Sequence, residues 1–193
     1  LKGTEPVDEL DLSNKRLGVA SVVVVAKCIK SNEALASINL RGNGFGSAGW
    51  CAIFNALRDN KNKIASWDLS GQGIDAEAAK AIAEYVAVSG ALTSLNLSAN
   101  RLCGVWKERD WHGQEKQKGT YDAAGITAIA EALRVNGALT SLDISSNHPG
   151  IGTEGAKAIA DALRVNGALT DLSLAGDWLG AEEATSIAEA LRV

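Results

Sequence analysis

Residues 139–168 read LTSLDISSNHPGIGTEGAKAIADALRVNGA, and closely similar segments recur elsewhere in the chain. LTSLNLSAN stands at residues 92–100 and GITAIAEALRVNGA at residues 125–138, so both halves of the quoted stretch have copies. Self-similarity with a period of about 28 residues is typical of proteins that stack one short structural motif on its own copies. This repeat decides the fold.

The repeat divides the chain into six units of 28, 29, 28, 47, 30 and 25 residues. The fourth unit is long because it contains an insertion at about residues 103–121. Nothing in the composition suggests a second domain, so we expect one domain over residues 1–193. The units occupy residues 7–34, 35–63, 64–91, 92–138 with the insertion, 139–168 and 169–193.

Each unit predicts a short strand followed by a helix. Leu95 and Leu97 alternate with polar residues, which indicates a half-buried strand. Ala156, Ile159 and Ala160 then form one apolar helical stripe. We therefore expect a right-handed α/β solenoid, curved so that parallel strands line the concave face and helices the convex face. The strands are expected near Leu10, Ile38, Trp67, Leu95, Leu142 and Leu172.

The spacing L-x-x-L-x-L-x-x-N-x-L resembles the leucine-rich repeat family, in the long, helix-containing form typified by ribonuclease inhibitor. The resemblance covers nearly the whole chain after Pro6. It implies the solenoid fold and a protein ligand, although the family binds many unrelated partners. The matching residues are Leu92, Leu95, Leu97, Asn100 and Leu102 in the fourth unit, and Leu139, Leu142, Ile144, Asn147 and Ile151 in the fifth.

The resemblance also implies a ladder of asparagine side chains that bond to the backbone of neighbouring turns. The ladder is expected to be incomplete, because other residue types occupy its place in three units. The asparagines are Asn43, Asn100 and Asn147, and the exceptions are Lys15, Gln72 and Asp177. Left-handed glycines are expected to end three of the helices, at Gly90, Gly137 and Gly167.

The composition disfavours several classes of function. A net charge of −4 argues against nucleic acid as a partner. The longest uncharged apolar run, residues 17–26, is too short to span a bilayer, so direct membrane insertion is not expected. Cys28, Cys51 and Cys103 are widely spaced and odd in number. They indicate reduced thiols in an intracellular compartment, cytoplasmic or organellar, rather than a secreted disulfide framework.

The two ends of the chain carry expectations of their own. The sequence begins with Leu1 and contains no methionine, which indicates that residues have been removed before it. The last unit ends at Val193 without the polar cap that a solenoid needs. We expect the array to continue there, or a neighbouring molecule to cover it.

No constellation of residues predicts catalysis, a cofactor or a metal. GFGSAG at residues 44–49 matches a dinucleotide-binding fingerprint by its letters, but Gly49 is the repeat glycine shared with Gly125 and Gly155. Cys103 and His112 could approach each other across the insertion, yet the ligand spacing typical of zinc is absent. We therefore predict that the protein is not an enzyme.

The predicted partner-binding residues lie on the rim between strands and helices, because that is where the insertion emerges. The concave face itself is small, polar and mildly acidic, without aromatic anchors. Long loops are usually functional or disordered, and aromatic residues with arginine usually anchor interfaces. The alternative is that the insertion's tryptophans fold back over the chain's own helices. The predicted contact residues are Trp106, Arg109, Trp111, His112, Tyr121, His148 and Trp178.

The leading functional interpretation is a non-catalytic protein-binding scaffold that uses this rim. Two alternatives stay open. One is a structural subunit of a large multiprotein assembly, with an organelle such as the plastid as one location. The other is a regulator or inhibitor of an enzyme or GTPase, as in ribonuclease inhibitor and the GTPase-activating repeat proteins that the array resembles. No catalytic residue of those activators can be matched in this sequence.

Overall fold

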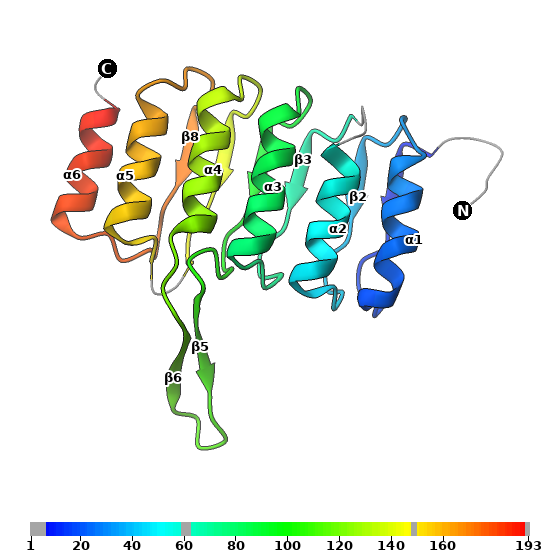
Figure 1. Cartoon of the computed structure of the whole chain (residues 1–193), viewed down its shortest axis with the longest axis horizontal. Coiled ribbons are helices and arrows are strands. Elements are labelled where there is room, and N and C mark those ends of the chain that lie inside the picture. The colour runs from blue at the N-terminus through cyan, green and yellow to red at the C-terminus, as the bar shows by residue number, and fades with distance from the viewer. Residues whose placement is uncertain (1–6, 59–62, 148–149, 192–193) are drawn as a thin grey trace.

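The structure is a computed structural model that describes residues 7–58, 63–147 and 150–191, without the side chains of 107–109. Strand and helix alternate along the chain, with the strands on one side and the helices on the other (Figure 1). The pairs are β1 (Glu9–Asp11) and α1 (Val19–Lys30), β2 (Ser37–Asn39) and α2 (Gly46–Arg58), β3 (Ser66–Asp68) and α3 (Ala76–Val88), β4 (Ser94–Asn96) and α4 (Ala124–Val135), β7 (Ser141–Asp143) and α5 (Gly152–Leu163), and β8 (Asp171–Ser173) and α6 (Ala181–Ala190).

The strands pair in parallel, in the register that the repeat predicts. Leu95 lies opposite Trp67 on one side and Leu142 on the other, and Leu142 lies opposite Leu172. The central residue is the least exposed in β1, β2, β3, β4 and β7, because alternate side chains point to opposite faces and only one face meets the helices. The six predicted strand positions are confirmed.

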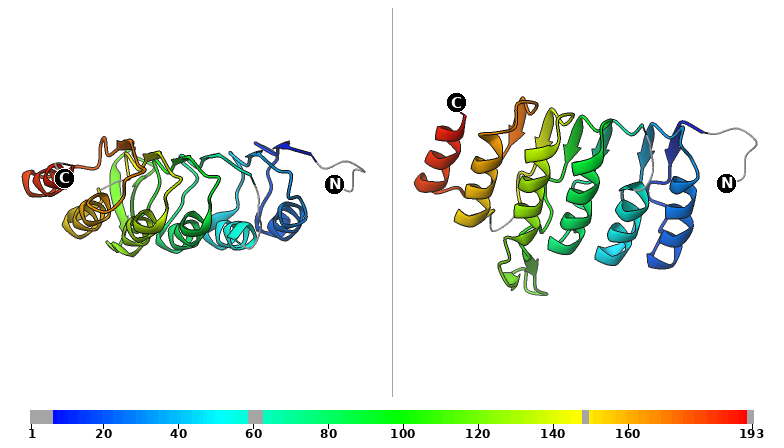
Figure 2. Two further views of the ribbon diagram at one scale, coloured as in Figure 1. Left: turned by 90° about the horizontal axis from the view of Figure 1, so that it is seen from above. Right: turned by 45° about the horizontal axis from the view of Figure 1, so that its top comes forward.

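The array is curved. Seen from above, the helices follow an arc whose ends bend toward the strand side, so the helices lie on the convex face (Figure 2). A helix is wider than the spacing between paired strands, and this difference bends the stack. The predicted α/β solenoid is confirmed.

The sheet is interrupted between β2 and β3, which the sequence did not predict. β1 and β2 form one sheet, and β3, β4, β7 and β8 form another. Aromatic side chains fill this interval: the ring of Phe54 lies 5.3 Å from that of Trp67 and 5.5 Å from that of Tyr85. Trp67 occupies the core position that leucine takes in other units, and its larger ring coincides with the break.

The asparagine ladder is present and buried at its centre. Asn100 donates from Nδ2 to the carbonyl of Leu69 in the preceding unit at 2.8 Å and to that of Leu97 at 3.0 Å. Its Oδ1 accepts the N–H of Ile74 at 3.0 Å. One side chain therefore satisfies three backbone groups that would otherwise be buried without partners. Asn43 and Asn147 bond in the same manner.

The prediction of left-handed glycines at the helix ends was wrong. Gly90, Gly137 and Gly167 do not adopt positive φ. At two of these helix ends an asparagine side chain bonds to backbone groups instead. Asn136 donates to the carbonyl of Val86 at 2.7 Å and accepts the N–H of Leu139 at 2.7 Å. Asn166 repeats this arrangement one unit later. A second asparagine ladder therefore connects the units at the opposite edge of the solenoid.

Candidate functional site

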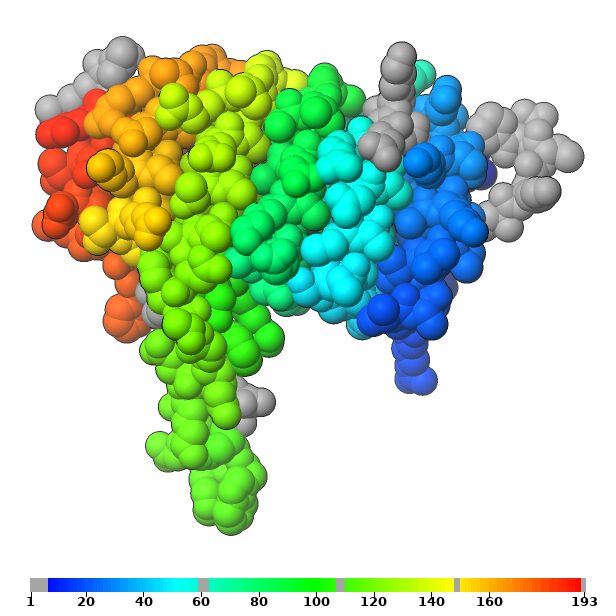
Figure 3. Space-filling model, viewed as in Figure 1, coloured from blue at the N-terminus to red at the C-terminus, as the bar shows by residue number. Residues whose placement is uncertain are grey.

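The insertion forms a β-hairpin. β5 (Val105–Arg109) and β6 (Glu115–Gly119) pair antiparallel, with Val105 opposite Gly119 at the base and Arg109 opposite Glu115 near the tip. The hairpin leaves the edge at which strands end and helices begin, and it projects clear of the solenoid body (Figure 3). Every residue of β6 is exposed.

Asp110 organises the tip. Its Oδ1 accepts the N–H groups of His112 and Gln114, both at 3.0 Å, and its carbonyl accepts the N–H of Gly113 at 2.8 Å. Gly113 has a φ of 78°, which makes this a turn closed by a left-handed glycine. Hydrogen bonds from Gln114, then from Lys116 and His112, lower the pKa of Asp110. The turn is therefore held by polar contacts, without an apolar core of its own.

Tyr121 fixes the base of the hairpin to the next unit. Its hydroxyl donates to the carbonyl of Ile151 at 2.8 Å. A Cβ added to Gly152 would lie 2.5 Å from that hydroxyl, so the ring packs directly on the backbone that begins α5. Burial raises the pKa of Tyr121.

Trp106 braces the hairpin from its other strand. The guanidinium carbon of Arg101 lies 4.6 Å from the centre of its ring, a cation–π contact with the preceding turn of the solenoid. The ring also packs on Gly119, where an added Cβ would lie 2.8 Å from it. Two aromatic residues thus hold the direction of the hairpin relative to the array.

Trp111 lies at the tip and does not fold back on the helices. Its side chain is 90% exposed, and its ring lies 3.4 Å from that of His112. The alternative that both tryptophans pack on their own chain therefore applies to Trp106, which is half-buried, and not to Trp111.

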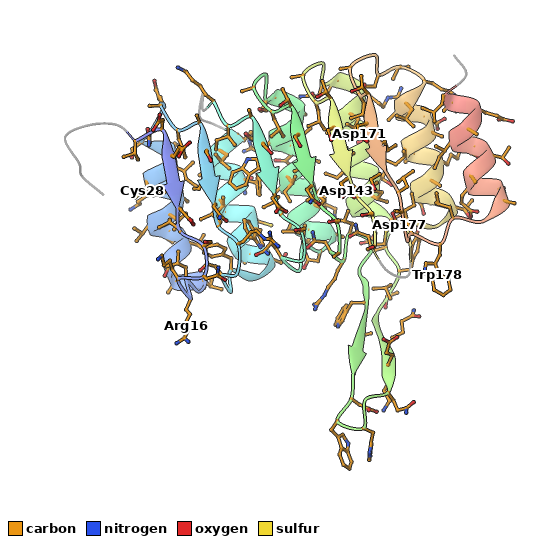
Figure 4. All side chains as sticks on the ribbon, turned by 180° about the vertical axis from the view of Figure 1, so that it is seen from behind. Arg16, Cys28, Asp143, Asp171, Asp177 and Trp178 are labelled. Carbon is orange, nitrogen blue, oxygen red and sulfur yellow. The ribbon has the colours of Figure 1, made fainter. Side chains whose placement is uncertain are left out.

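Trp178 lies on the same edge of the solenoid as the hairpin (Figure 4). It is 75% exposed and has a φ of 50°, a left-handed conformation that is costly for a bulky residue. Two further predicted contact residues cannot be compared in this way. His148 lies outside the described residues, and only the backbone of Arg109 is described.

Asp177, beside Trp178, has features that the sequence did not reveal as functional. It is 1% exposed, and its Oδ1 accepts the N–H of Asn147 at 2.8 Å. Its Oδ2 is buried and bonds to none of the described residues. Burial, opposed by the Asn147 hydrogen bond and assisted by the charge of Asp143, raises the pKa of Asp177 to about 7. The sequence did contain one indication of its unusual role, which is an aspartate at the repeat position that asparagine occupies in other units.

The three cysteines differ in burial. Cys28 and Cys51 are half-buried, whereas Cys103 is buried. Burial raises the pKa of Cys103 to about 12, so its thiol is not a nucleophile near neutral pH. Cys103 and His112 do not approach each other, because the hairpin carries the histidine to its tip.

The described part of the chain contains no group of three or more His, Cys, Asp or Glu residues able to hold a metal. The glycine of the dinucleotide-like motif has a packing role. A Cβ on Gly49 would lie 2.8 Å from Phe45 and 2.9 Å from Val22 of the preceding helix. Within the same ranges, no helix is long and apolar enough to cross a membrane.

Comparison with known proteins agrees with this architecture. Residues 138–160 match the family described as Leucine Rich repeat. RAN GTPase-activating protein 2 of Arabidopsis thaliana is 27% identical over 99 residues, which is 51% of this chain but only 18% of the plant protein.

Two solved structures share the fold. Leiomodin-1 Actin-Binding Site 2 matches with a TM-score of 0.66 and 21% identity, over 86% of this chain and 85% of that chain. The tropomodulin C-terminal domain of Caenorhabditis elegans matches with a TM-score of 0.54 and 13% identity, over 96% and 83%. Together with the repeat spacing and the asparagine ladder, these matches support a leucine-rich repeat protein of the ribonuclease-inhibitor-like type.

Proposed function

We propose that this protein is a non-catalytic, intracellular protein-binding scaffold whose contact surface is the rim that carries the hairpin. We call this the rim surface. The observation that carries the proposal is Trp111, which is 90% exposed at the tip of a hairpin anchored through Tyr121 and Trp106. The rim surface comprises Trp106, Arg109, Trp111, His112, Tyr121, His148 and Trp178.

The physical argument concerns the cost of binding. Ordering a flexible loop costs about 1–2 kcal/mol per residue, and this cost reduces affinity when the loop is ordered only in the complex. The turn at Asp110 and the contact of Tyr121 with Ile151 order the hairpin in the free protein. A large aromatic side chain on a pre-ordered support is a typical interface anchor.

A second candidate is regulation of a GTPase or another enzyme. The observation that favours it is the similarity to a RAN GTPase-activating protein, which extends over about half of this chain. The name of the leiomodin-1 fragment likewise refers to a protein partner, actin. Since the chain spans 18% of the plant protein, that protein's activity remains a hypothesis for this one. The role of a structural subunit in a larger assembly, organellar or not, uses the same rim surface.

The proposal is tested with one mutant and two measurements. A photo-crosslinking amino acid at His112 identifies the molecule that contacts the tip, and the affinity of that molecule is then measured for Trp111→Ala. We expect Trp111→Ala to weaken binding by about 2 kcal/mol or more. The free energy of unfolding should hardly change, because Trp111 is exposed.

A matched control is Val135→Ala on α4, which truncates a side chain that is 70% exposed and lies away from the rim surface. It should leave both quantities unchanged. If Trp111→Ala lowered the unfolding free energy and left the affinity intact, the hairpin would be a structural element and the proposal would fail.

A further inference from the structure

The backbone after the ladder positions follows a rule wherever the next residue is described, which excludes His148 after Asn147. After Asn43 and Asn100 the next residue does not adopt positive φ. Where another residue type occupies the ladder position, the next residue is left-handed in each case. These residues are Arg16 at 55°, Gly73 at 69° and Trp178 at 50°.

The rule has a physical basis in the donor that asparagine supplies. In the complete rungs the side-chain amide donates to the carbonyl three residues earlier, as Asn147 does to Ile144 at 2.6 Å. Where this bond is present, the residue after Asn43 and Asn100 has an ordinary conformation. Where it is missing, that residue is left-handed. Glycine adopts this conformation readily, whereas Arg16 and Trp178 are strained.

Asp177 differs from the other two exceptions because it is buried. Lys15 is exposed, and Gln72 still donates an amide hydrogen to the carbonyl of Ser70 at 3.0 Å. Asp177 has the shape of asparagine but, as a carboxylate, has no hydrogen to donate. Its Oδ2 is buried and has no hydrogen-bond partner among the described residues. The carbonyl three residues earlier is that of Leu174.

A neutral Asp177 carboxyl would supply one of the two hydrogens that asparagine donates, because the protonated oxygen is a donor. Uptake of this proton near neutral pH is consistent with the buried environment, which raises the pKa to about 7. The charged groups that interact with it are Asp143 on β7, whose charge favours the proton, and Cys103 at the hairpin base, a neutral thiol. His148 directly follows Asn147 in the sequence, so the test includes it as a control.

We propose that Asp177 is a pH-responsive rung of the asparagine ladder, whose protonation supplies the missing donor and releases Trp178 from the left-handed conformation at the rim surface. The inference rests on the proposed function only in assigning Trp178 to that surface. Its test uses no binding partner, so its failure would leave the Trp111 experiment unaffected.

The experiment follows Trp178 directly. The full chain is labelled with 5-fluorotryptophan, which gives one fluorine resonance for each of the five tryptophans, and Trp178→Phe assigns the relevant one. In the wild type we expect the Trp178 resonance to titrate with a midpoint near 7, the value expected for Asp177. In Asp177→Asn the resonance should stay fixed at the acidic limit of the wild type at every pH.

Two variants separate this effect from general electrostatics. Asp171→Asn removes one charge from the exposed end of β8, and His148→Gln removes the nearby imidazole. Both should preserve the titration of Trp178. The proposal is overturned by a wild-type resonance that does not move, by a titration that survives in Asp177→Asn, or by one that disappears in His148→Gln.

Discussion

The hydroxyl of Tyr121 donates a hydrogen bond of 2.8 Å to the carbonyl of Ile151, and this bond joins the end of the hairpin to the unit that follows it. The carbonyl precedes α5, and Gly152 provides the space for the ring. A residue of the insertion thus completes the packing of the solenoid. In return, the solenoid determines where the hairpin points.

Tyr121→Phe removes this hydrogen bond and keeps the ring. We expect the free energy of unfolding to fall by about 1 kcal/mol, the usual net value of a partly buried hydrogen bond. Amide exchange should accelerate in β5 and β6 more than in β4 and β7, because the hairpin loses an anchor while the sheet keeps its pairing. Equal acceleration in all four strands would show that Tyr121 supports the whole fold instead.

Leu142→Ala tests the repeat register in the core. Leu142 is 1% exposed and lies between Leu95 and Leu172 in the sheet. Truncation should cost about 2–5 kcal/mol, measured by urea unfolding. Val165→Ala, at a side chain that is 58% exposed in the same unit, is the control and should cost less than about 0.5 kcal/mol.

The sequence predicts the strands and helices well because the pattern for each recurs in several repeat units. A single copy of Ser-Leu-Asp at residues 141–143 would be too short to identify a strand, but its recurrence at fixed spacing makes it clear. The hairpin has no such support. Beyond Val105 and Trp106 its strands are polar on both faces, so the alternation that marks a half-buried strand is absent. Asp110 and Gly113, at the first and fourth positions of a turn, were the available signal.

The helix ends and the candidate site show a second limit on prediction from sequence, which concerns contacts between neighbouring units. Gly137 follows Asn136 directly, and the general preference for glycine at helix ends concealed the asparagine that bonds to the neighbouring unit. The partner of a side chain across the stack depends on where the units meet. For the same reason, the burial of Asp177 could be seen only in three dimensions, although its departure from asparagine was visible in the sequence.

Ala99 offers a stabilising substitution. It has a φ of 55°, at a repeat position that glycine occupies in other units, as Gly42 at 68° and Gly71 at 64°. An L-residue in this conformation costs about 1–2 kcal/mol, of which glycine's larger unfolded-state entropy offsets roughly half.

Ala99→Gly should therefore raise the free energy of unfolding by about 0.5–1 kcal/mol in urea titrations. Ala188→Gly, at an exposed position of α6, provides the comparison. It should lower stability by about 1 kcal/mol, because glycine weakens a helix that is not strained at that position. Loss of stability in both variants would contradict the left-handed assignment of Ala99.

The last prediction concerns the pH dependence of stability, and its sign follows from Asp177. Folding raises the pKa of this carboxyl from its ordinary value of 3.8 to about 7. The contribution of the group to stability is therefore fully present below about pH 4, is lost as the pH rises toward 7, and is constant above that. Asp110 and Asp68, whose pKa values are lowered, act in the opposite direction, so the wild-type curve alone does not isolate the effect.

The difference between wild type and Asp177→Asn does isolate it, because the other carboxyl groups are common to both proteins. Near pH 4 the two should have similar free energies of unfolding. Toward about pH 8 the variant should become the more stable by an amount on the order of a few kcal/mol, since asparagine carries no charge to bury and restores the missing donor. Urea unfolding at closely spaced pH values measures this difference. A variant less stable than the wild type at about pH 8 would mean that the charged carboxylate itself is required at this position.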